Sequence, residues 1–188
     1  EELVKDIDYY SNGGGITFSG GECLLFLLHY EELLRKLREK GISICVETAL
    51  FVPCKNLEGI MQYIDYFFID VKTLECSICK EILGGDLSLY LKNLEFLHKN
   101  VSKDRIVYRI PLVQSFTLTK ENIKMIKTLI IKYQPAKVEI FGVHNMGDKK
   151  YQCLNSFKDP ILRVSASVLR NVKLFLEEAN CDVKINDF

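Results

Sequence analysis

The chain has 188 residues, the size of a single domain, and its 25 basic and 25 acidic side chains leave no net charge. That balance excludes the basic surface that nucleic acids and anionic membranes require. No apolar run approaches the roughly 20 residues that span a bilayer. The seven cysteines, an odd number, are scattered along the chain, which indicates a reduced, cytoplasmic protein.

Helical and strand patterns alternate along the chain without a linker or repeat. Nearly continuous apolar runs, typical of parallel strands buried on both faces, predict strands at Ile16–Phe18, Ile42–Val46, Tyr66–Ile69, Ile106–Ile110 and Val138–Val143. Apolar residues at helical spacing predict helices at Glu31–Lys40, around Leu57–Ile64, Leu87–Leu94 and Ile123–Ile130, and from about Pro160 to Ala179. The alternation predicts one α/β domain in which helices cover a parallel sheet, as an open sheet or a barrel.

The most informative motif is Gly13–Glu22, with the sequence Gly-Gly-Gly-Ile-Thr-Phe-Ser-Gly-Gly-Glu. Gly20 and Gly21 have no Cβ, so a ligand can approach their backbone closely. Glu22 adds a carboxylate where a phosphate site would need a lysine or an acid-free helix N-terminus. The motif therefore favours a cationic group such as an α-amine. The alternative is a plain strand-to-helix turn in which Glu22 is the first acid of the helix.

Each of the other predicted strands also carries a polar group at or near its carboxyl end. These groups are Glu47 and Thr48, Asp70 and Lys72, Arg109, and His144. In parallel α/β folds such ends share one face, where active sites lie. Acids, a lysine, an arginine and a histidine on one rim would suit a zwitterionic ligand. Simpler roles stay open. Asp70 can pair with Lys72 or with Arg109, and Glu47 can cap the next segment.

Two further groups of reactive residues are weaker candidates. Cys76-Ser-Ile-Cys79 is the one CxxC sequence of the chain. A redox or metal half-site is one interpretation, but no second Cys or His pair stands at metal-finger spacing, so coincidence is favoured. His29 and His98 lie in helical patterns, which favours structural roles for both.

The Gly13–Glu22 motif and the polar groups at the strand ends, taken in chain order, resemble the motifs of one enzyme family. This family is the glycyl-radical-enzyme activating enzymes, typified by the pyruvate formate-lyase activating enzyme, within the radical S-adenosylmethionine (SAM) superfamily. Gly13–Glu22 matches the family's glycine-rich Thr-Phe-Ser-Gly-Gly-Glu strand and exit, Glu47-Thr48 its acid-Thr pair, and Asp70-Val-Lys72 its Asp-Leu-Lys. Arg109-Ile-Pro111 matches an Arg-x-Pro strand, and His144 with Gly147 and Lys150-Tyr151 matches a His-x-x-Gly…Lys-Tyr segment. The resemblance covers essentially the whole chain.

The resemblance implies a partial (β/α)6 TIM-like barrel, with parallel strands and helices outside, that binds SAM across its strand ends. Gly20, Gly21 and Glu22 would meet the methionyl amine. Glu47, Asp70, Lys72 and His144 would hold the carboxylate, ribose and adenine region, and Thr48 and Arg109 complete the implied set. The reaction would be one-electron cleavage of SAM to methionine and a 5′-deoxyadenosyl radical. That radical would take a hydrogen atom from a glycine of a pyruvate formate-lyase-like enzyme, and flavodoxin would supply electrons.

The chain departs from the family pattern in several places. It has no Cys-x3-Cys-x2-Cys sequence, which in the family holds a [4Fe–4S] cluster. We expect that loop and the first barrel strand to precede Glu1 in a longer enzyme, and this chain alone to bind no cluster and to be inactive. Cys23 replaces the family's Pro, and Leu50 replaces its Gly, so that a bulky side chain would narrow the approach to the site. Further differences are Val113-Gln114-Ser115 in place of Ile-Pro-Gly and Gly142-Val143 in place of Pro-Tyr.

Two other functions stay open. One is a non-catalytic remnant of the fold, and the other is a barrel enzyme that uses Asp70, Lys72 and His144 for acid–base chemistry on a small polar metabolite. Without the first strand, Ile16–Phe18 becomes a sheet edge, and exposed edges promote association. We therefore expect a single domain over residues 1–188 that binds SAM weakly and forms dimers through that edge.

Overall fold

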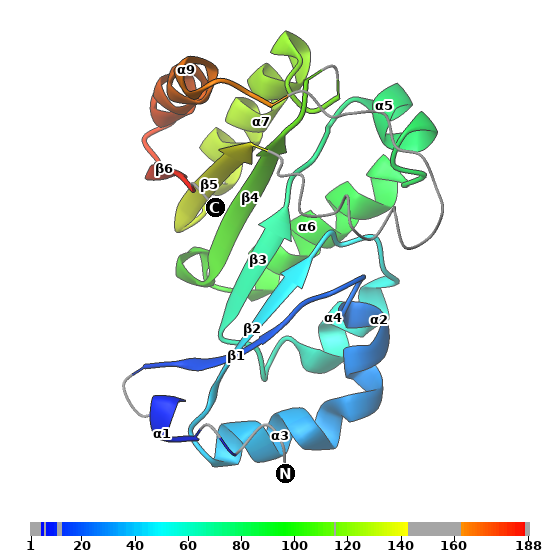
Figure 1. The fold of residues 1–188 in the computed structure, drawn as a ribbon. Helices are drawn as coiled ribbons and strands as arrows, with labels where there is room; N and C mark the ends of the chain where they lie inside the picture. The colour runs from blue at the N-terminus through cyan, green and yellow to red at the C-terminus, as the bar shows by residue number, and fades with distance from the viewer. Residues whose placement is uncertain (1–4, 6, 11–12, 115, 143–162, 187–188) are drawn as a thin grey trace, which may run out of the picture.

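A computed structural model describes residues 5, 7–10, 13–114, 116–142 and 163–186. Its centre is a six-stranded sheet in which every strand is parallel to its neighbour and the spatial order follows the chain (Figure 1). The strands are β1 (Gly15–Phe18), β2 (Ser43–Thr48), β3 (Tyr66–Asp70), β4 (Ile106–Leu112), β5 (Lys137–Gly142) and β6 (Val183–Ile185). Since β1 and β6 do not pair with each other, the sheet is open.

All but one of the described helices connect successive strands, and the exception, α1 (Ile7–Tyr10), precedes β1. The others are α2 (Leu24–Leu27), α3 (Glu31–Glu39), α4 (Cys54–Ile60), α5 (Cys76–Glu81), α6 (Leu87–Asn100), α7 (Lys120–Tyr133) and α9 (Ala166–Glu177), with short 3₁₀ helices η2 (Leu28–Tyr30) and η3 (Lys103–Arg105). Crossovers between parallel strands are right-handed, so strands added in one direction place their helices on one side, where Figure 1 shows α4, α6 and α7. Over the described residues, no helix is both long and apolar enough to cross a bilayer.

The longer helices begin where a side chain binds the first free backbone amides. Asp86 accepts hydrogen bonds from the Ser88 and Leu89 amides at the start of α6, and Thr119 accepts one from Asn122 at the start of α7. Such caps satisfy donors that have no partner within the helix. The predicted helices are confirmed apart from their ends, and the last one begins at Ala166, after the cap residue Ser165, rather than near Pro160. The short helices α2 and α5 were not predicted.

The two faces of the sheet differ in burial. On one face the side chains are fully buried against the helices, as for Ile44, Phe67 and Ile110, each 0% exposed. On the other face β2 and β3 are half-buried to exposed, and burial along each of them alternates. We call these the helix-covered face and the open face. The prediction that the strands are buried on both faces was therefore wrong for β2 and β3, whereas in β4 and β5 the open face also holds the buried residues Val107 and Glu139.

The edges of the sheet also differ from the sequence prediction in one respect. β1 is an edge strand within the described part of the chain, as expected, and it pairs with β2 alone. A Cβ at Gly15 would lie 2.2 Å from the carbonyl oxygen of Ser43, so only glycine permits this approach. β6 was not predicted, and it extends the sheet beyond β5.

Candidate functional site at the strand ends

The turn after β1 leaves its backbone open to a ligand. Gly20 has φ of +106°, which a residue with a Cβ rarely adopts. A Cβ built at Gly20 or at Gly21 meets no atom within 4 Å, so both residues border open space. The predicted role of these two glycines, a backbone that a ligand can approach closely, is compatible with this geometry.

The Glu22 carboxylate joins the ends of β1 and β2. Its Oε1 accepts hydrogen bonds from the Thr48 hydroxyl at 2.8 Å and from the Leu24 amide at 3.3 Å, and its Oε2 accepts one from the Ala49 amide at 2.9 Å. The bond to Leu24 also makes it the acid at the start of α2, the simpler of the two predicted roles. A carboxylate has about four acceptor positions, so roughly one remains for a cationic donor.

Arg109 pairs with Glu47 on the open face. The distance from Arg109 Nη1 to Glu47 Oε1 is 2.6 Å, and the two side chains are 16% and 38% exposed. The guanidinium lies 5.3 Å from the centre of the Phe141 ring. The sequence also allowed a pair between Arg109 and Asp70, but in the structure the partner of Arg109 is Glu47. Arg109 Nε is buried without a hydrogen-bond partner among the described atoms, which leaves a donor for a ligand to satisfy.

Asp70 and Lys72 form the ion pair that was one of the two predicted outcomes. Lys72 Nζ lies 3.3 Å from Asp70 Oδ2, and the side chains are 36% and 29% exposed. Asp70 is directly opposite Arg109 in the register of β3 and β4. The strand ends therefore bring the Asp70–Lys72 pair next to the Glu47–Arg109 pair, at the same edge of the sheet as Glu22.

The remaining predicted residues have different positions. Thr48 is 2% exposed, and its hydroxyl donates to Glu22 and accepts from the Leu50 amide. The buried Thr48 side chain therefore orients the Glu22 carboxylate. His144 lies outside the described residues, as do Gly147, Lys150 and Tyr151 of the same motif.

The two substitutions nearest to the site are accommodated by the fold. Leu50 has φ of +58°, a conformation that favours glycine and costs another residue about 1 kcal/mol or more. Its side chain is 0% exposed in the core, so the expectation that it narrows the approach was wrong. The Cys23 thiol donates to the Glu47 carbonyl. Burial, followed by the charge of Glu22, raises the pKa of this thiol to about 11, so it is protonated at neutral pH.

The described residues contain no group of three His, Cys, Asp or Glu side chains that could hold a metal ion. Cys76 and Cys79 both lie in α5, where Cys79 is buried and Cys76 is exposed. Burial raises the pKa of Cys79. This geometry does not present two thiols together at the surface.

Sequence patterns do not identify two kinds of residue near this edge. Phe141 lies against the Arg109 guanidinium, but in the sequence it is only one apolar residue of a predicted strand. Asn56, Asn93 and Asn122 are buried in helices. A signal for them existed, because each stands four residues before a buried apolar residue of its helix (Ile60, Leu97 and Ile126), on the stripe where an apolar side chain is expected.

The fold and the strand-end groups define a parallel α/β partial barrel, whose ligands bind at the carboxyl ends of the strands. The sequence model of the radical SAM superfamily matches residues 1–129, and the chain belongs to that superfamily. It is 36% identical over 160 residues to the indoleacetate decarboxylase activating enzyme of Tractidigestivibacter scatoligenes, with 83% of this chain and 50% of the relative covered. It is 30% identical over 155 residues to the pyruvate formate-lyase 2-activating enzyme of Escherichia coli (strain K12), with 82% and 52% covered.

Solved structures show the same fold. A domain of the pyruvate-formate lyase-activating enzyme from Bacteroides vulgatus ATCC 8482 superposes with a TM-score of 0.75 at 22% identity, over 93% of this chain and 100% of that one. Streptococcus suis SuiB superposes with a TM-score of 0.68 at 14% identity, over 92% and 39% of the two chains. The predicted fold class is confirmed, and the sheet is not closed.

The superfamily implies two cofactors, SAM and a [4Fe–4S] cluster, and the residues fit them unequally. Glycines bordering open space, a remaining acceptor on Glu22 and the unpaired Nε of Arg109 fit a zwitterion such as SAM. The described residues hold no cluster-ligand set, and the whole sequence holds no Cys-x3-Cys-x2-Cys. The chain spans about half the length of the curated relatives it matches.

Proposed function

We propose that this chain is the SAM-binding part of a glycyl-radical-enzyme activating enzyme. The observation that carries the proposal is the arrangement of the two charge pairs beside the Gly-Gly-Glu turn. This arrangement places positive and negative side chains and the glycine backbone of the turn at one edge of the sheet, in a chain of the radical SAM superfamily. The names of the relatives, which include activating enzymes for two decarboxylases and for pyruvate formate-lyase 2, support the class of reaction.

In this proposal each strand end binds a different part of SAM. The backbone of Gly20 and Gly21 and the remaining acceptor of Glu22 bind the α-amine. Lys72 binds an anionic or hydroxyl group, with Asp70 as its counter-charge when the ligand is absent. Arg109 donates its unpaired Nε while Glu47 and Phe141 hold the guanidinium in place.

The whole enzyme would cleave SAM reductively. One electron would break the bond between sulfur and C5′ of SAM, which would give methionine and a 5′-deoxyadenosyl radical. That radical would remove a hydrogen atom from a glycine Cα of the partner enzyme, leaving 5′-deoxyadenosine and a glycyl radical. The electron would come from a [4Fe–4S] centre reduced by a donor such as flavodoxin. None of the described residues is assigned to that centre.

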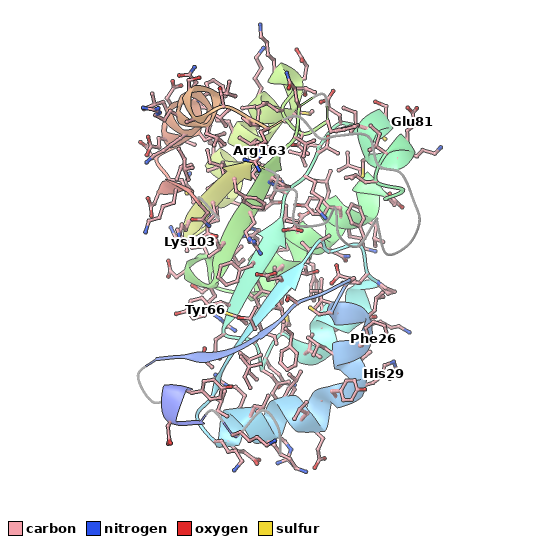
Figure 2. The ribbon with its side chains drawn as sticks, in the orientation of Figure 1. Phe26, His29, Tyr66, Glu81, Lys103 and Arg163 are labelled. Carbon is pink, nitrogen blue, oxygen red and sulfur yellow. The ribbon has the colours of Figure 1, made fainter. Side chains whose placement is uncertain are left out.

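The proposal is tested by equilibrium dialysis of the chain against radiolabelled SAM. We expect weak, saturable binding in the high-micromolar to millimolar range, about −4 to −5 kcal/mol. Asp70→Ala should weaken it about tenfold, or roughly 1.4 kcal/mol, because Lys72 loses its counter-charge and its position. Asp104→Ala is the matched control, since Asp104 is exposed in η3 before β4, at the amino end of the sheet, where Figure 2 labels Tyr66 and Lys103.

Three results would contradict the proposal. The first is no saturable binding at millimolar SAM. The second is equal affinity in the wild type and in Asp70→Ala. The third is tighter binding of a phosphorylated sugar than of SAM, which would favour the alternative of a barrel enzyme for small metabolites.

A further inference from the structure

We infer that three asparagines, Asn56, Asn93 and Asn122, are positioning residues that hold the strand-end loops in the geometry of the ligand site. They lie in α4, α6 and α7, and are 7%, 0% and 0% exposed. As a statement about SAM the inference rests on the proposed function. As a statement about the loops it rests on the hydrogen bonds alone.

Asn56 holds the segment that follows β1. Its Nδ2 donates to the carbonyl oxygen of Leu24 at 3.0 Å. Leu24 is two residues after Glu22, and its amide donates to the Glu22 carboxylate. The first asparagine therefore holds the residue through which Glu22 is attached to α2.

Asn93 holds the loop that follows β2. Its Nδ2 donates to the carbonyl oxygens of Leu50 at 2.8 Å and Val52 at 2.7 Å. This loop contains the left-handed backbone of Leu50 and the Ala49 amide that binds Glu22. An apolar residue in place of Asn93 would leave two carbonyl groups without these donors, and buried carbonyls need partners.

Asn122 holds two loops at once. Its Nδ2 donates to the carbonyl oxygen of Lys72 at 3.0 Å and to that of Thr117 at 2.7 Å, and its Oδ1 accepts from the Leu74 amide at 2.8 Å. Lys72 is itself a candidate ligand residue, and Thr117 lies in the loop after β4. This side chain therefore connects the ends of β3 and β4.

The three contacts follow one rule. In each case the asparagine comes from the helix that follows the next strand: α4 follows β2 and holds the loop of β1, α6 follows β3 and holds the loop of β2, and α7 follows β4 and holds the loop of β3. The segments after β1, β2 and β3 are thus each bound by an asparagine of the adjacent β/α unit, and Asn122 also binds the loop that leads into its own helix. The positions of Glu22, Thr48 and Lys72 then depend on how neighbouring helices pack on the helix-covered face.

The test uses the 188-residue chain with Asn122→Ala and Asn93→Ala, measured by hydrogen–deuterium exchange and by SAM dialysis. Asn100→Ala is the matched control, because Asn100 is exposed in α6 and donates only to Phe96 of the same helix. Ile126→Val is the control for general destabilisation, since Ile126 is a buried neighbour of Asn122 in α7. In Asn122→Ala we expect faster exchange confined to residues 71–75 and 113–119, with the strand amides unchanged.

We also expect SAM affinity to fall roughly tenfold in Asn122→Ala, the scale seen when an outer partner of a metal ligand is removed, and to stay unchanged in both controls. Exchange that accelerates equally across all strands, or that is unchanged in the loops, would overturn the inference. So would a loop that becomes mobile while SAM affinity stays the same. If the wild type binds no SAM, the proposed function fails, and the exchange pattern alone decides whether the asparagines fix the loops.

Discussion

The helix-covered face and the open face of the sheet are built from alternate residues of the same strands. In β3, Phe67 is 0% exposed against the helices, whereas Phe68 lies half-buried on the open face between Glu47 of β2 and Val107 of β4. One face buries apolar side chains and stabilises the fold. The other leaves Glu47 and Asp70 partly exposed and Arg109 mostly buried, with all three charges paired.

This difference shows how a small domain can combine a stable core with a charged site. Charges deep in a core would cost more free energy than their pairing returns. On the open face the charges keep some contact with solvent. The strands that carry them are packed against the helices on their other face. Substitutions on the two faces should therefore affect different properties, which the next experiments test in order of expected effect.

The largest effect should come from the helix-covered face. Phe67→Ala should lower the free energy of unfolding by about 3 to 5 kcal/mol, because it leaves a cavity in a closely packed core. Phe68→Ala, the adjacent residue with the same side chain, should cost about 1 kcal/mol because less apolar area is lost. Urea unfolding monitored by circular dichroism measures both. Equal losses would show that the open face is covered as completely as the other.

A smaller effect is expected when a charge on the open face loses its partner. Glu47→Gln should destabilise the chain by about 1 to 2 kcal/mol, because the mostly buried guanidinium of Arg109 loses its counter-charge and keeps a neutral amide oxygen and the Phe141 ring as neighbours. The double variant Glu47→Gln with Arg109→Met should recover most of this loss, since it removes both charges. A single variant as stable as the wild type would mean that the pair contributes nothing to folding.

The smallest effect concerns pH and again lies on the helix-covered face. His98 bonds to the Tyr108 hydroxyl at 2.7 Å and stacks on Tyr133, and burial lowers its pKa from 6.5 to about 4. The unfolded chain therefore binds a proton at a higher pH than the folded chain does. The stability due to neutral His98 is complete above pH 6.5 and is lost as the pH falls toward 4.

That loss should reach about 1 kcal/mol at pH 4, because solvent reaches part of the ring and reduces the full linkage value. His98→Gln does not titrate, so the difference in unfolding free energy between the wild type and this variant should change between pH 6.5 and 4. A constant difference for His98→Gln would contradict the buried, neutral state.

Five of the six strands could be predicted because each is an apolar run that ends in a polar residue. β6 was missed because it is three residues long and carries a lysine, Lys184, in its centre. α2 was missed because Leu24–Leu27 is apolar throughout, and a run without polar residues has no periodicity to measure. Local patterns therefore identify an element when it is long enough and when its apolar and polar residues alternate clearly.

The strand-end residues were also predictable, but their partners were predictable only in part. Lys72 and Asp70 are two residues apart, so their side chains project on one face, and their pairing was one of two stated outcomes. The choice of Glu47 over Asp70 as the partner of Arg109 depends on side-chain conformations across three strands, which no sequence spacing specifies. The buried asparagines were missed because a polar residue in a helix is usually exposed.

The identity of chain order and strand order has a consequence for biosynthesis. Every strand of the sheet pairs with the strand made just before it, so no segment has to wait for a distant partner that the ribosome has not yet produced. Contacts between neighbouring segments of the chain favour fast folding, and domains fold from the N-terminus during synthesis. The sheet can therefore grow one β/α unit at a time, and the asparagines of α4, α6 and α7 then reach segments that are already in place.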